Sequence, residues 1–528
     1  MGPAVTELEL TLVTSPRHFP ALKLALAERG GNGASPPSHV TSTYFDSADL
    51  KLRQNHLSLA IEAQDQRRVQ ALADRGGNGG PGEEWRDPIA GDRPDRAAPE
   101  SGPRLAAVVA EDELHPLFHT DLRRTRFTVD GDPTVEIAAV LDEGEIRAEA
   151  GGANEPLCEV GLALKRGEPA ALYDMALKLL DVAPLRIETR SQSDRGYRLA
   201  GADTGAARAK PFAIAPGMTV EAVLQAMGRE CIGQLLRYEP AALAGEGEAF
   251  HQMRVALRRL RSALAAVKSA LPPDDYRQAR EELKWLASSL GAARNWDAFT
   301  TGLLRPVRDA LPEDADLKRL VDAAKRRRRT AYDGAKEAIG SHRYAAATLR
   351  LARWFETRGW REQKASEESA PLFLPISDVA PRLIERRWRQ VRKRCRGFKK
   401  QSLAERHQLR ITLKKLRYVI EFLGPLYDAG EVKAVMRRVK PLQEELGHLN
   451  DVCTAQALMN ELARPTGNNA VEVGRDAGLV LGWHFRGLAD EEPKLRRNVR
   501  RLRRIKPFWH PLPPEPASEA AARKEEAE

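Results

Sequence analysis

The stretch that decides the fold of the second half of this chain is HQMRVALRRLR, residues 251–261, which returns as HQLRITLKKLR at residues 407–417. The offset between the two copies is 407 − 251 = 156 residues. An α-helix turns about 100° per residue, so the apolar positions of each copy collect on one face and the basic positions on the other. Each copy therefore predicts an amphipathic helix with a stripe of cations. The stripes consist of His251, Arg254, Arg258, Arg259 and Arg261 in the first copy, and of His407, Arg410, Lys414, Lys415 and Arg417 in the second.

Neither stripe contains a carboxylate, and Glu421 is the first acidic residue after the second copy begins. Like charges three or four residues apart on a helix repel each other by about 0.2–0.5 kcal/mol per pair. A solvated helix surface of mixed charge would avoid this repulsion. Because both stripes keep their like charges together in spite of this repulsion, they predict a polyanionic partner.

Charge is distributed unevenly along the 528 residues. The net charge is +10, to which residues 1–210 contribute 25 − 33 = −8 and residues 211–528 contribute 59 − 41 = +18. Only the basic half can attract a polyanion over a long range. The length allows about two to four domains, each large enough to bury its own core.

Other features of the composition narrow the class of protein. No apolar run approaches the roughly 18 residues of a membrane span, and the N-terminus lacks the pattern of a signal peptide. The four cysteines are scattered, without a Cys-x-x-Cys pair. This usage indicates reduced thiols in a cytoplasmic protein rather than a disulfide framework or a zinc site.

The acidic half alternates apolar and polar residues as β-strands do. Residues 5–13 (VTELELTLV) place Glu7, Glu9 and Thr11 on one face and leucines on the other. This pattern predicts an antiparallel α+β domain, and inward-facing polar residues favour a closed barrel with a polar tunnel. Further strands are predicted at 57–62, 69–73, 124–129, 134–140, 157–165 and 185–190, with a helix at about 168–181.

Several motifs in residues 5–200 resemble the CYTH domain, the family of triphosphate tunnel metalloenzymes. They are the opening Glu-x-Glu strand, YFDSADLKLR at 44–53, VEI at 135–137, LDEGEI at 141–146, Glu159 to Lys165, and SQSDRGYRL at 191–199. The resemblance implies an eight-stranded antiparallel tunnel in which basic side chains hold a triphosphate and glutamates hold Mg²⁺ or Mn²⁺. The implied phosphate-binding positions are Arg124, Arg126, Lys165 and Arg195, and the implied metal-binding positions are Glu7, Glu9, Glu136 and Glu159.

The chain departs from this family where its chemistry takes place. Residues that differ from the family's cations or carboxylates are Thr11, Ala60, Glu62, Ala73, Gly161, Ala163 and Gln192. Removing one electrostatic contact of this kind typically lowers a rate by about 10²–10³-fold. We therefore expect the domain to be catalytically impaired and assign no catalytic residue. The alternative is a divalent-metal-dependent inorganic triphosphatase that hydrolyses tripolyphosphate.

The basic half follows the helical period from Thr219 onward. Each stripe is followed by a Leu-Gly segment, LGAARNWD at 290–297 and LGHLND at 446–451. This repetition predicts an all-α bundle of two related halves, whose stripes meet in one central groove. Breaks between helices are expected near 240–247, 271–274, 291–296, 311–314, 369–378, 424–430 and 464–469.

The doubled motif H-x-x-R-x-x-x-[RK]-[RK]-x-R, with its Leu-Gly segments, closely resembles the CHAD domain, the conserved histidine α-helical domain. The resemblance implies that the ten stripe residues bind inorganic polyphosphate. Arg392 and Lys399, from the basic run before the second stripe, are expected to share the groove. Such binding requires no cofactor, and we expect the protein in the cytoplasm, on polyphosphate granules where a cell makes them. A nucleic-acid-binding protein is a further alternative, although few aromatic residues are available for base stacking.

Composition also suggests where the domains end. Small residues, glycine and proline predict a linker at 201–217, and a tail rich in proline, alanine and glutamate is expected to be disordered. The predicted organisation is a CYTH-like domain at 1–200, a CHAD-like domain at 218–510 with halves of about 218–370 and 371–510, and an acidic tail at 511–528.

Overall fold

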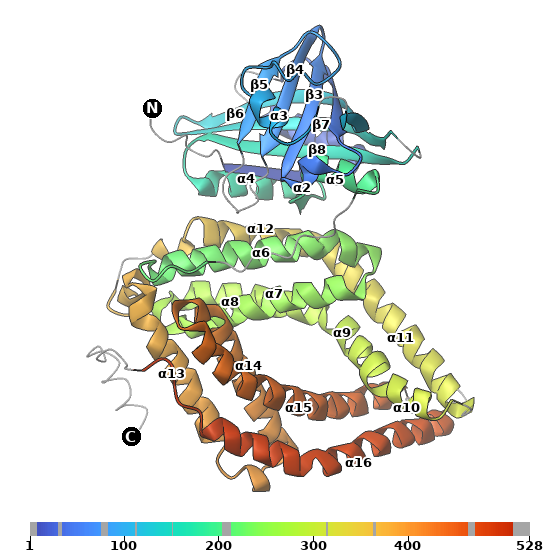
Figure 1. The fold of residues 1–528 in the computed structure, drawn as a ribbon, viewed down its shortest axis with the longest axis vertical. Coiled ribbons are helices and arrows are strands. Elements are labelled where there is room, and N and C mark those ends of the chain that lie inside the picture. Colours follow the sequence, from blue (N-terminus) through green and yellow to red (C-terminus); the bar gives the residue numbers. More distant parts are fainter. Residues whose placement is uncertain are drawn as a thin grey trace. The chain divides into compact units, whose positions relative to one another are not determined.

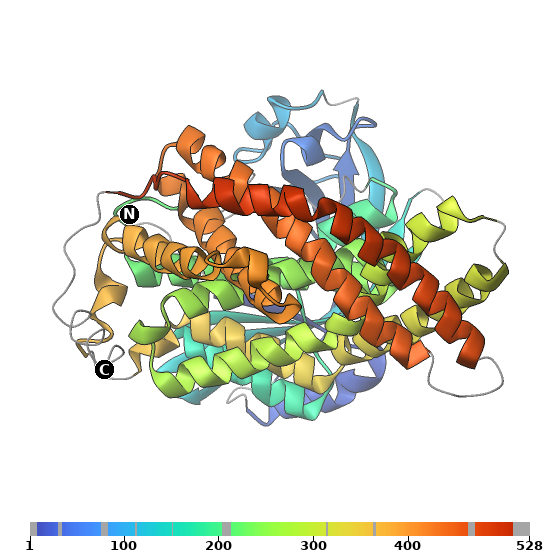
Figure 2. The same cartoon turned by 90° about the horizontal axis from the view of Figure 1, so that it is seen from below.

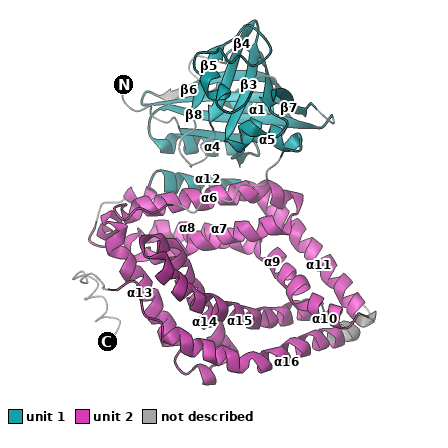
Figure 3. Ribbon diagram, in the orientation of Figure 1, with its two compact units in different colours: residues 1–208, 345–357 teal, residues 209–344, 358–528 magenta. Residues whose placement is uncertain are grey.

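The computed structural model describes residues 8–29, 34–74, 83–110, 113–149, 152–202, 213–312, 315–362, 366–462 and 470–510. The chain forms two compact units, one of residues 1–208 with 345–357 and one of residues 209–344 with 358–528 (Figures 1 and 3). Glu7, most of the predicted linker and the predicted tail lie outside the described residues. The predicted order, an antiparallel sheet domain followed by an all-α domain, is confirmed.

The first unit is built on one sheet, in which nine strands are described and every neighbouring pair is antiparallel. The spatial order is β5-β4-β3-β2-β6-β7-β8-β1-β9. The family resemblance implied eight strands. Strand β5 was not predicted, because its sequence, EWRDP, lacks the alternation of apolar and polar residues that marks a strand. The strands are β1 Leu8–Val13, β2 Ser38–Asp46, β3 Leu57–Gln64, β4 Arg67–Asp74, β5 Glu84–Pro88, β6 His115–Asp132, β7 Val135–Ala148, β8 Asn154–Arg166 and β9 Arg186–Glu188.

Helices α1 (Phe19–Ala27) and α4 (Pro169–Val182) supply apolar side chains to the core on one face of the sheet. Leu10 and Leu12 of β1 are buried in this core, as their alternation with Glu9 and Thr11 predicted. Residues 345–357, most of which belong to α12 (His342–Glu356), are part of this unit and add small apolar side chains to the same core. The helix predicted at 168–181 is confirmed.

The other face of the sheet carries the short helix α5 (Gln192–Leu199). Ser191 and Asp194 form a capping box at its start, which satisfies backbone N–H groups of the first turn. A Cβ atom at Gly196 would lie 2.0 Å from the ring of Phe118, so only glycine allows this close approach. The approach brings Gln192 and Arg195 to the polar side chains of the sheet.

The second unit is helical throughout its described residues, apart from an isolated bridge between Thr219 and Pro375. No described helix of the chain is long and apolar enough to cross a membrane. Besides α12 and short 3-10 segments, the helices are α6 Val220–Ala244, α7 Gly247–Ala266, α8 Pro273–Ser289, α9 Gly291–Asp297, the π-helix η4 Ala298–Leu304, α10 Arg305–Ala310, α11 Ala315–Ile339, α13 Ile376–Arg394, α14 Leu403–Leu423, α15 Ala429–Leu462 and α16 Ala470–Arg503.

The two halves of this unit begin with similar pairs of helices. Helix α6 packs on α7, α13 packs on α14, and α7 also contacts α14. Helices α15 and α16 lie side by side, and together with η4 and α11 they enclose a second apolar core (Figures 1 and 2). The unit therefore has its basic helices at the junction between the halves.

The Leu-Gly segments adopt different structures in the two halves. The break predicted near 291–296 lies at Leu290, between α8 and α9, and residues 291–296 themselves are helical. Residues 446–451 lie inside α15, which runs on to Leu462. A glycine within a helical pattern lowers helix stability by only about 1 kcal/mol, which the surrounding packing can offset.

Candidate functional site

Helix α7 holds the first stripe against α8. Met253, Leu257 and Leu260 are buried on its apolar face, which leaves Arg254 and Arg258 half-buried on the other side. Arg254 Nη1 donates a hydrogen bond of 3.0 Å to the carbonyl oxygen of Ala287, and this contact fixes the direction of the guanidinium.

Helix α14 holds the second stripe in a comparable way. A capping box of Ser402 and Glu405 starts the helix, and Leu409, Leu413 and Leu416 are buried on its apolar face. Arg410 and Lys414 are half-buried on the polar face, whereas His407, at the beginning of the helix, is exposed.

The glycine of each Leu-Gly segment lies beside the first arginine of its stripe. A Cβ atom at Gly291 would lie 3.4 Å from Arg254 Nη1, and one at Gly447 would lie 3.9 Å from Arg410 Nε. The repeated spacing in the sequence thus corresponds to a repeated contact. Both distances are those of ordinary van der Waals contact, so each glycine packs directly against its arginine.

The cations of the two stripes act on each other. Burial lowers the pKa of Arg410, Lys414 and Lys415, and cations of α7 lower it further: Arg258 acts on the first two and Arg261 on the third. We call these facing cations the basic track; it consists of His251, Arg254, Arg258 and Arg261 of α7, and of Arg410, Lys414, Lys415 and Arg417 of α14.

Burial and, after it, repulsion between neighbouring cations both disfavour the charged forms of the track residues. Burial, then Arg410 and Arg258, lower the pKa of Lys414 to about 7. Burial and the neighbouring Arg258 and Arg294 lower the pKa of Arg254 to about 10, which still leaves it charged at neutral pH. His251 also has a lowered pKa, because of burial and then Arg294. The free track is therefore an electrostatically unfavourable arrangement.

Few carboxylates relieve this repulsion. Asp451 of α15 comes within 3.9 Å of Arg410 Nη2, and Glu421 within 3.3 Å of Arg417 Nε. The Nε atoms of Arg258 and Arg410 are buried and donate no hydrogen bond to the part of the chain that the structure describes. The described part of the protein therefore does not satisfy these two donors.

Sequence reasoning missed several cations that lie at the track. Arg294 of α9 acts on His251 and Arg254, and Arg280 of α8 acts on Arg261. From α13, Arg387 and Arg394 act on Lys415. Arg294 lies in the first Leu-Gly segment, close in sequence to Gly291. This position in a repeated motif could have identified Arg294 as a residue of the track.

The place of Arg392 and Lys399 in the groove, predicted from the basic run before the second stripe, stays a prediction. Arg392 and Lys399 are exposed, and neither is among the charges that act on Lys415. Arg387, in contrast, is buried and donates from Nη2 to the carbonyl oxygen of Ala265 on α7 at 2.8 Å. Part of this run is thus used to join α13 to α7.

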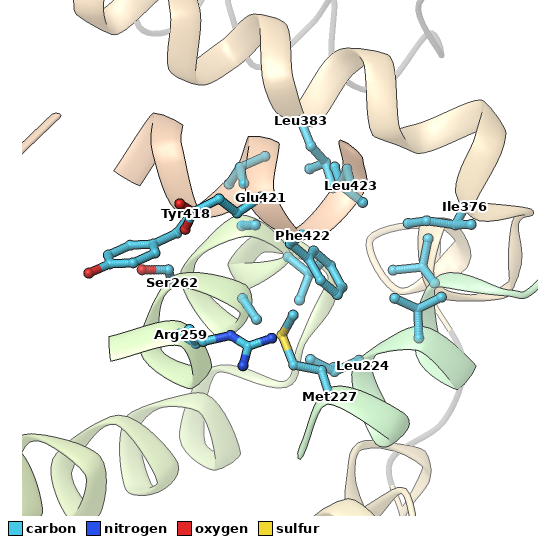
Figure 4. A pocket seen from close by; sticks show the side chains of 16 residues that line it. Leu224, Met227, Arg259, Ser262, Ile376, Leu383, Tyr418, Glu421, Phe422 and Leu423 are labelled. Atoms are coloured by element: carbon cyan, nitrogen blue, oxygen red, sulfur yellow. The ribbon is translucent and has the colours of Figure 1, made fainter. Parts of the chain in front are cut away.

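Arg259 has surroundings different from those of the other stripe residues. It lines a small cavity of about 50 Å³ between α6, α7, α13 and α14, together with apolar side chains such as Met227 and Phe422 (Figure 4). Its Nη1 lies 3.4 Å from the amide oxygen of Gln234 on α6. This position on the flank of the helix separates Arg259 from the track.

In the sheet domain, Arg124, Asp142 and Glu159 lie opposite one another on β6, β7 and β8. Residues paired in this way point to the same face of a sheet. Arg124 donates from Nε and Nη2 to the two carboxylate oxygens of Asp142, at 2.7 Å each, and this pairing raises the pKa of Arg124. The cation is held by the protein's own carboxylate.

Helix α5 completes this network. Arg195, which is 4 % exposed, donates from Nη1 to Glu159 at 2.5 Å and from Nε to Glu155 at 2.9 Å. Gln192 Nε2 donates to Glu159 at 3.0 Å. Burial raises the pKa of Glu159, although both partners counteract that effect.

The register also places Glu9, Arg126 and Lys165 on the same face of the sheet as Arg124 and Glu159. Glu9, Arg126 and Lys165 are exposed, and Glu136 lies 3.7 Å from Arg166. Within the described residues, no group of three or more histidine, cysteine, aspartate or glutamate side chains could hold a metal ion. Glu159 is already bound by Gln192 and Arg195 of α5, and Glu7 lies outside the described residues.

One substituted position illustrates how the tunnel chemistry has changed. Ala60, where the family has an arginine, is buried in an apolar cluster with Tyr44 and Phe118. The rings of these two aromatic residues stack with centroids 4.5 Å apart. Apart from the hydroxyl groups of Tyr44 and Tyr197 the cluster is apolar, so it contains no carboxylate to pair with a cation at this position.

Comparison with known families agrees with the two units. Residues 6–197 match the family model of the CYTH domain, and residues 226–460 match that of the CHAD domain. The chain carries a CYTH domain followed by a CHAD domain. The basic track lies within the CHAD match, and the Arg124–Arg195 network lies within the CYTH match.

Related proteins cover both domains or one of them. Two uncharacterized proteins of Mycobacterium tuberculosis, from strains CDC 1551 and H37Rv, are each 25% identical over 433 residues, which span 76% of this chain and 79% of theirs. The crystal structure of the CHAD domain from Ricinus communis is 25% identical and covers 58% of this chain and 99% of its own, with a TM-score of 0.49. An adenylyl cyclase-like protein from Hippeastrum, described as having a dominant triphosphatase activity, is 19% identical and covers 35% of this chain and 93% of its own, with a TM-score of 0.27.

Proposed function

We propose that this protein binds inorganic polyphosphate along the basic track of its CHAD domain. The observation that carries the proposal is that two helices, separated by 156 residues in the sequence, direct half-buried cations toward each other with few carboxylates between them. Such an arrangement is unfavourable in the free protein and becomes favourable when a linear polyanion lies between the cations.

The chemistry of the track suits phosphate chains rather than nucleic acids. Arginine can donate two parallel hydrogen bonds to phosphate oxygens, and lysine contributes a point charge. The half-buried guanidinium groups of Arg258 and Arg410 lie on the two helices that contact each other. Tryptophans such as Trp296 and Trp388 are buried in the helical core, where they cannot stack on bases.

The test is a pair of charge reversals, Arg254→Glu with Arg410→Glu. Each change removes an attraction and adds a repulsion at the track, so we expect a loss of affinity for long-chain polyphosphate of at least about 10²-fold by calorimetry. The matched control is Arg326→Glu with Arg329→Glu on α11, which changes the net charge equally at exposed positions. If both pairs lower affinity to the same extent, binding depends on net charge and the assignment to the track is wrong.

Competition separates this proposal from a nucleic-acid-binding function. At matched phosphate concentration, single-stranded DNA should fail to displace labelled polyphosphate from the protein. Displacement by DNA at equal concentrations would favour the nucleic-acid alternative. Salt dependence does not discriminate, because counterion release drives both kinds of binding.

For the CYTH domain we propose impaired catalysis, supported by the carboxylate partners of Arg124 and Arg195 and by the buried apolar position of Ala60. The alternative, a triphosphatase dependent on Mg²⁺ or Mn²⁺, is tested by phosphate release from tripolyphosphate by the full chain. We expect no metal-dependent release above that of a Glu159→Gln variant. Turnover that this variant abolishes would establish the enzyme instead.

A further inference from the structure

Lys414 lies at the centre of the basic track. It is one helical turn from Arg410 on one side and from Arg417 on the other, and α14 contacts α7, which brings Arg258 toward it. It is half-buried and forms no ion pair within the described residues. The charges that act on it are Arg410 and Arg417 of α14, Arg258 of α7 and Asp451 of α15.

A lysine in this position differs from an arginine in one respect. Arginine keeps its proton under almost any surroundings, whereas the ammonium group of lysine loses its proton readily when it is buried among other cations. Burial disfavours the ammonium form of Lys414, and three arginines act on it against a single carboxylate, so the side chain releases its proton readily. Its pKa of about 7 places this release at neutral pH.

We propose that binding of a polyphosphate chain to the track is coupled to the uptake of one proton by Lys414, so that affinity falls as the pH rises above neutrality. The inference rests on the proposed function, since it concerns the same site. A phosphate chain placed against the track reverses the sign of the local potential. The amine of Lys414 then takes a proton from the buffer and becomes an ammonium group that donates hydrogen bonds to the anion.

The pKa of Lys414, about 7 in the free protein, sets the pH range in which binding takes up a proton. Below about pH 6 Lys414 is already charged in the free protein, so binding takes up almost no proton there. At pH 8 about nine-tenths of the free protein carries the neutral amine, and uptake approaches about 0.9 proton per bound site. His251 has a pKa below its ordinary value of 6.5, so any proton that it takes up belongs to a lower pH range.

The experiment is calorimetry of the full-length protein with long-chain polyphosphate at pH 8, in two buffers of different ionisation enthalpy. The difference in heat gives the number of protons taken up per site. Long chains keep terminal phosphates, whose protons titrate near pH 6, a small part of the ligand. We expect about 0.9 proton for the wild type and close to zero for Lys414→Arg, which keeps the positive charge but does not titrate in this range.

The control is Lys433→Arg, an exposed position on α15 that should retain the uptake of the wild type. Absence of binding heat in either buffer would contradict the proposed function itself. Binding without proton uptake, or uptake that persists in Lys414→Arg, would overturn the inference and leave the proposed function intact. If Lys414→Arg fails to fold, the wild type alone decides: its affinity should fall up to tenfold per pH unit between pH 7.5 and 9, and a constant affinity would overturn the coupling.

Discussion

Arg195 of the CYTH domain and Arg410 of the CHAD domain are both shielded from solvent, with side chains 5% and 14% exposed, yet their surroundings differ. Arg195 lies 2.5 Å from Glu159 and 2.9 Å from Glu155, whereas the carboxylate nearest Arg410 is 3.9 Å away. The first charge is neutralised by the protein, and the second lies among other cations. A shielded arginine can therefore stabilise the fold or bind a ligand. Carboxylates within hydrogen-bonding distance indicate the first role, and their absence leaves the charge for a ligand.

The two networks as a whole differ in the same way. In the CYTH domain, Arg53 and Arg124 also have carboxylate partners, Asp194 and Asp142. Charges so arranged contribute to the fold but offer little to an incoming triphosphate. In the CHAD domain, the cations of the track repel one another, and this repulsion lowers the stability of the free protein. An anion that binds between them removes the repulsion, which increases its affinity.

The largest effect should follow from removing a cation of the CYTH network. Arg195→Met leaves Glu155 and the buried Glu159 without their common partner, and breaking a buried pair in this way costs about 3–5 kcal/mol. Hydrogen exchange, measured by mass spectrometry, should rise over β8 and α5 and stay unchanged over α14. Unchanged protection of β8 would show that this pairing does not stabilise the domain.

A smaller effect of opposite sign is expected at the track. Lys414→Met removes a charge that three arginines repel, so we expect the CHAD domain to melt about 2–4 °C higher at pH 7, or about 1 kcal/mol. Because the folded pKa of about 7 lies below the ordinary 10.5, the unfolded chain binds more protons between these values. Wild-type stability therefore rises with pH across this window, and the advantage of the variant should shrink by pH 9. A lower melting temperature at pH 7 would contradict the repulsion.

The smallest effect separates two exposed arginines in the last turn of α13. Arg394 acts on Lys415 and Arg392 does not, so Arg394→Ala should weaken polyphosphate binding by about three- to tenfold and lower the salt-dependence slope by about 1. Arg392→Ala should change affinity less than about twofold. Affinities are measured by titration at several salt concentrations. Equal losses of affinity in the two variants would support the role in the groove that the sequence predicted for Arg392.

Local patterns account for what could be predicted. The apolar faces of α7 and α14 follow from a period of 3.6 residues, and the strand of residues 8–13 follows from alternation. The carboxylate partners could not be predicted in this way. Asp297 pairs with Arg328 at 2.7 Å and accepts a hydrogen bond from Tyr332. Its place at the end of the first Leu-Gly segment nevertheless corresponds to that of Asp451 in the second, which faces Arg410. Which arginine each of these aspartates meets depends on which helices pack together.

The sequence by itself determined which residues carry charge and which face of a helix they share, because a helix face depends only on positions a few residues apart. It could not determine that Arg258 would face Lys414, or that Arg195 would be held by Glu159. These pairs join segments 156 and 36 residues apart, and their distances depend on how whole helices and strands pack. Only the tertiary structure decided which cations were neutralised and which were left to act on a ligand.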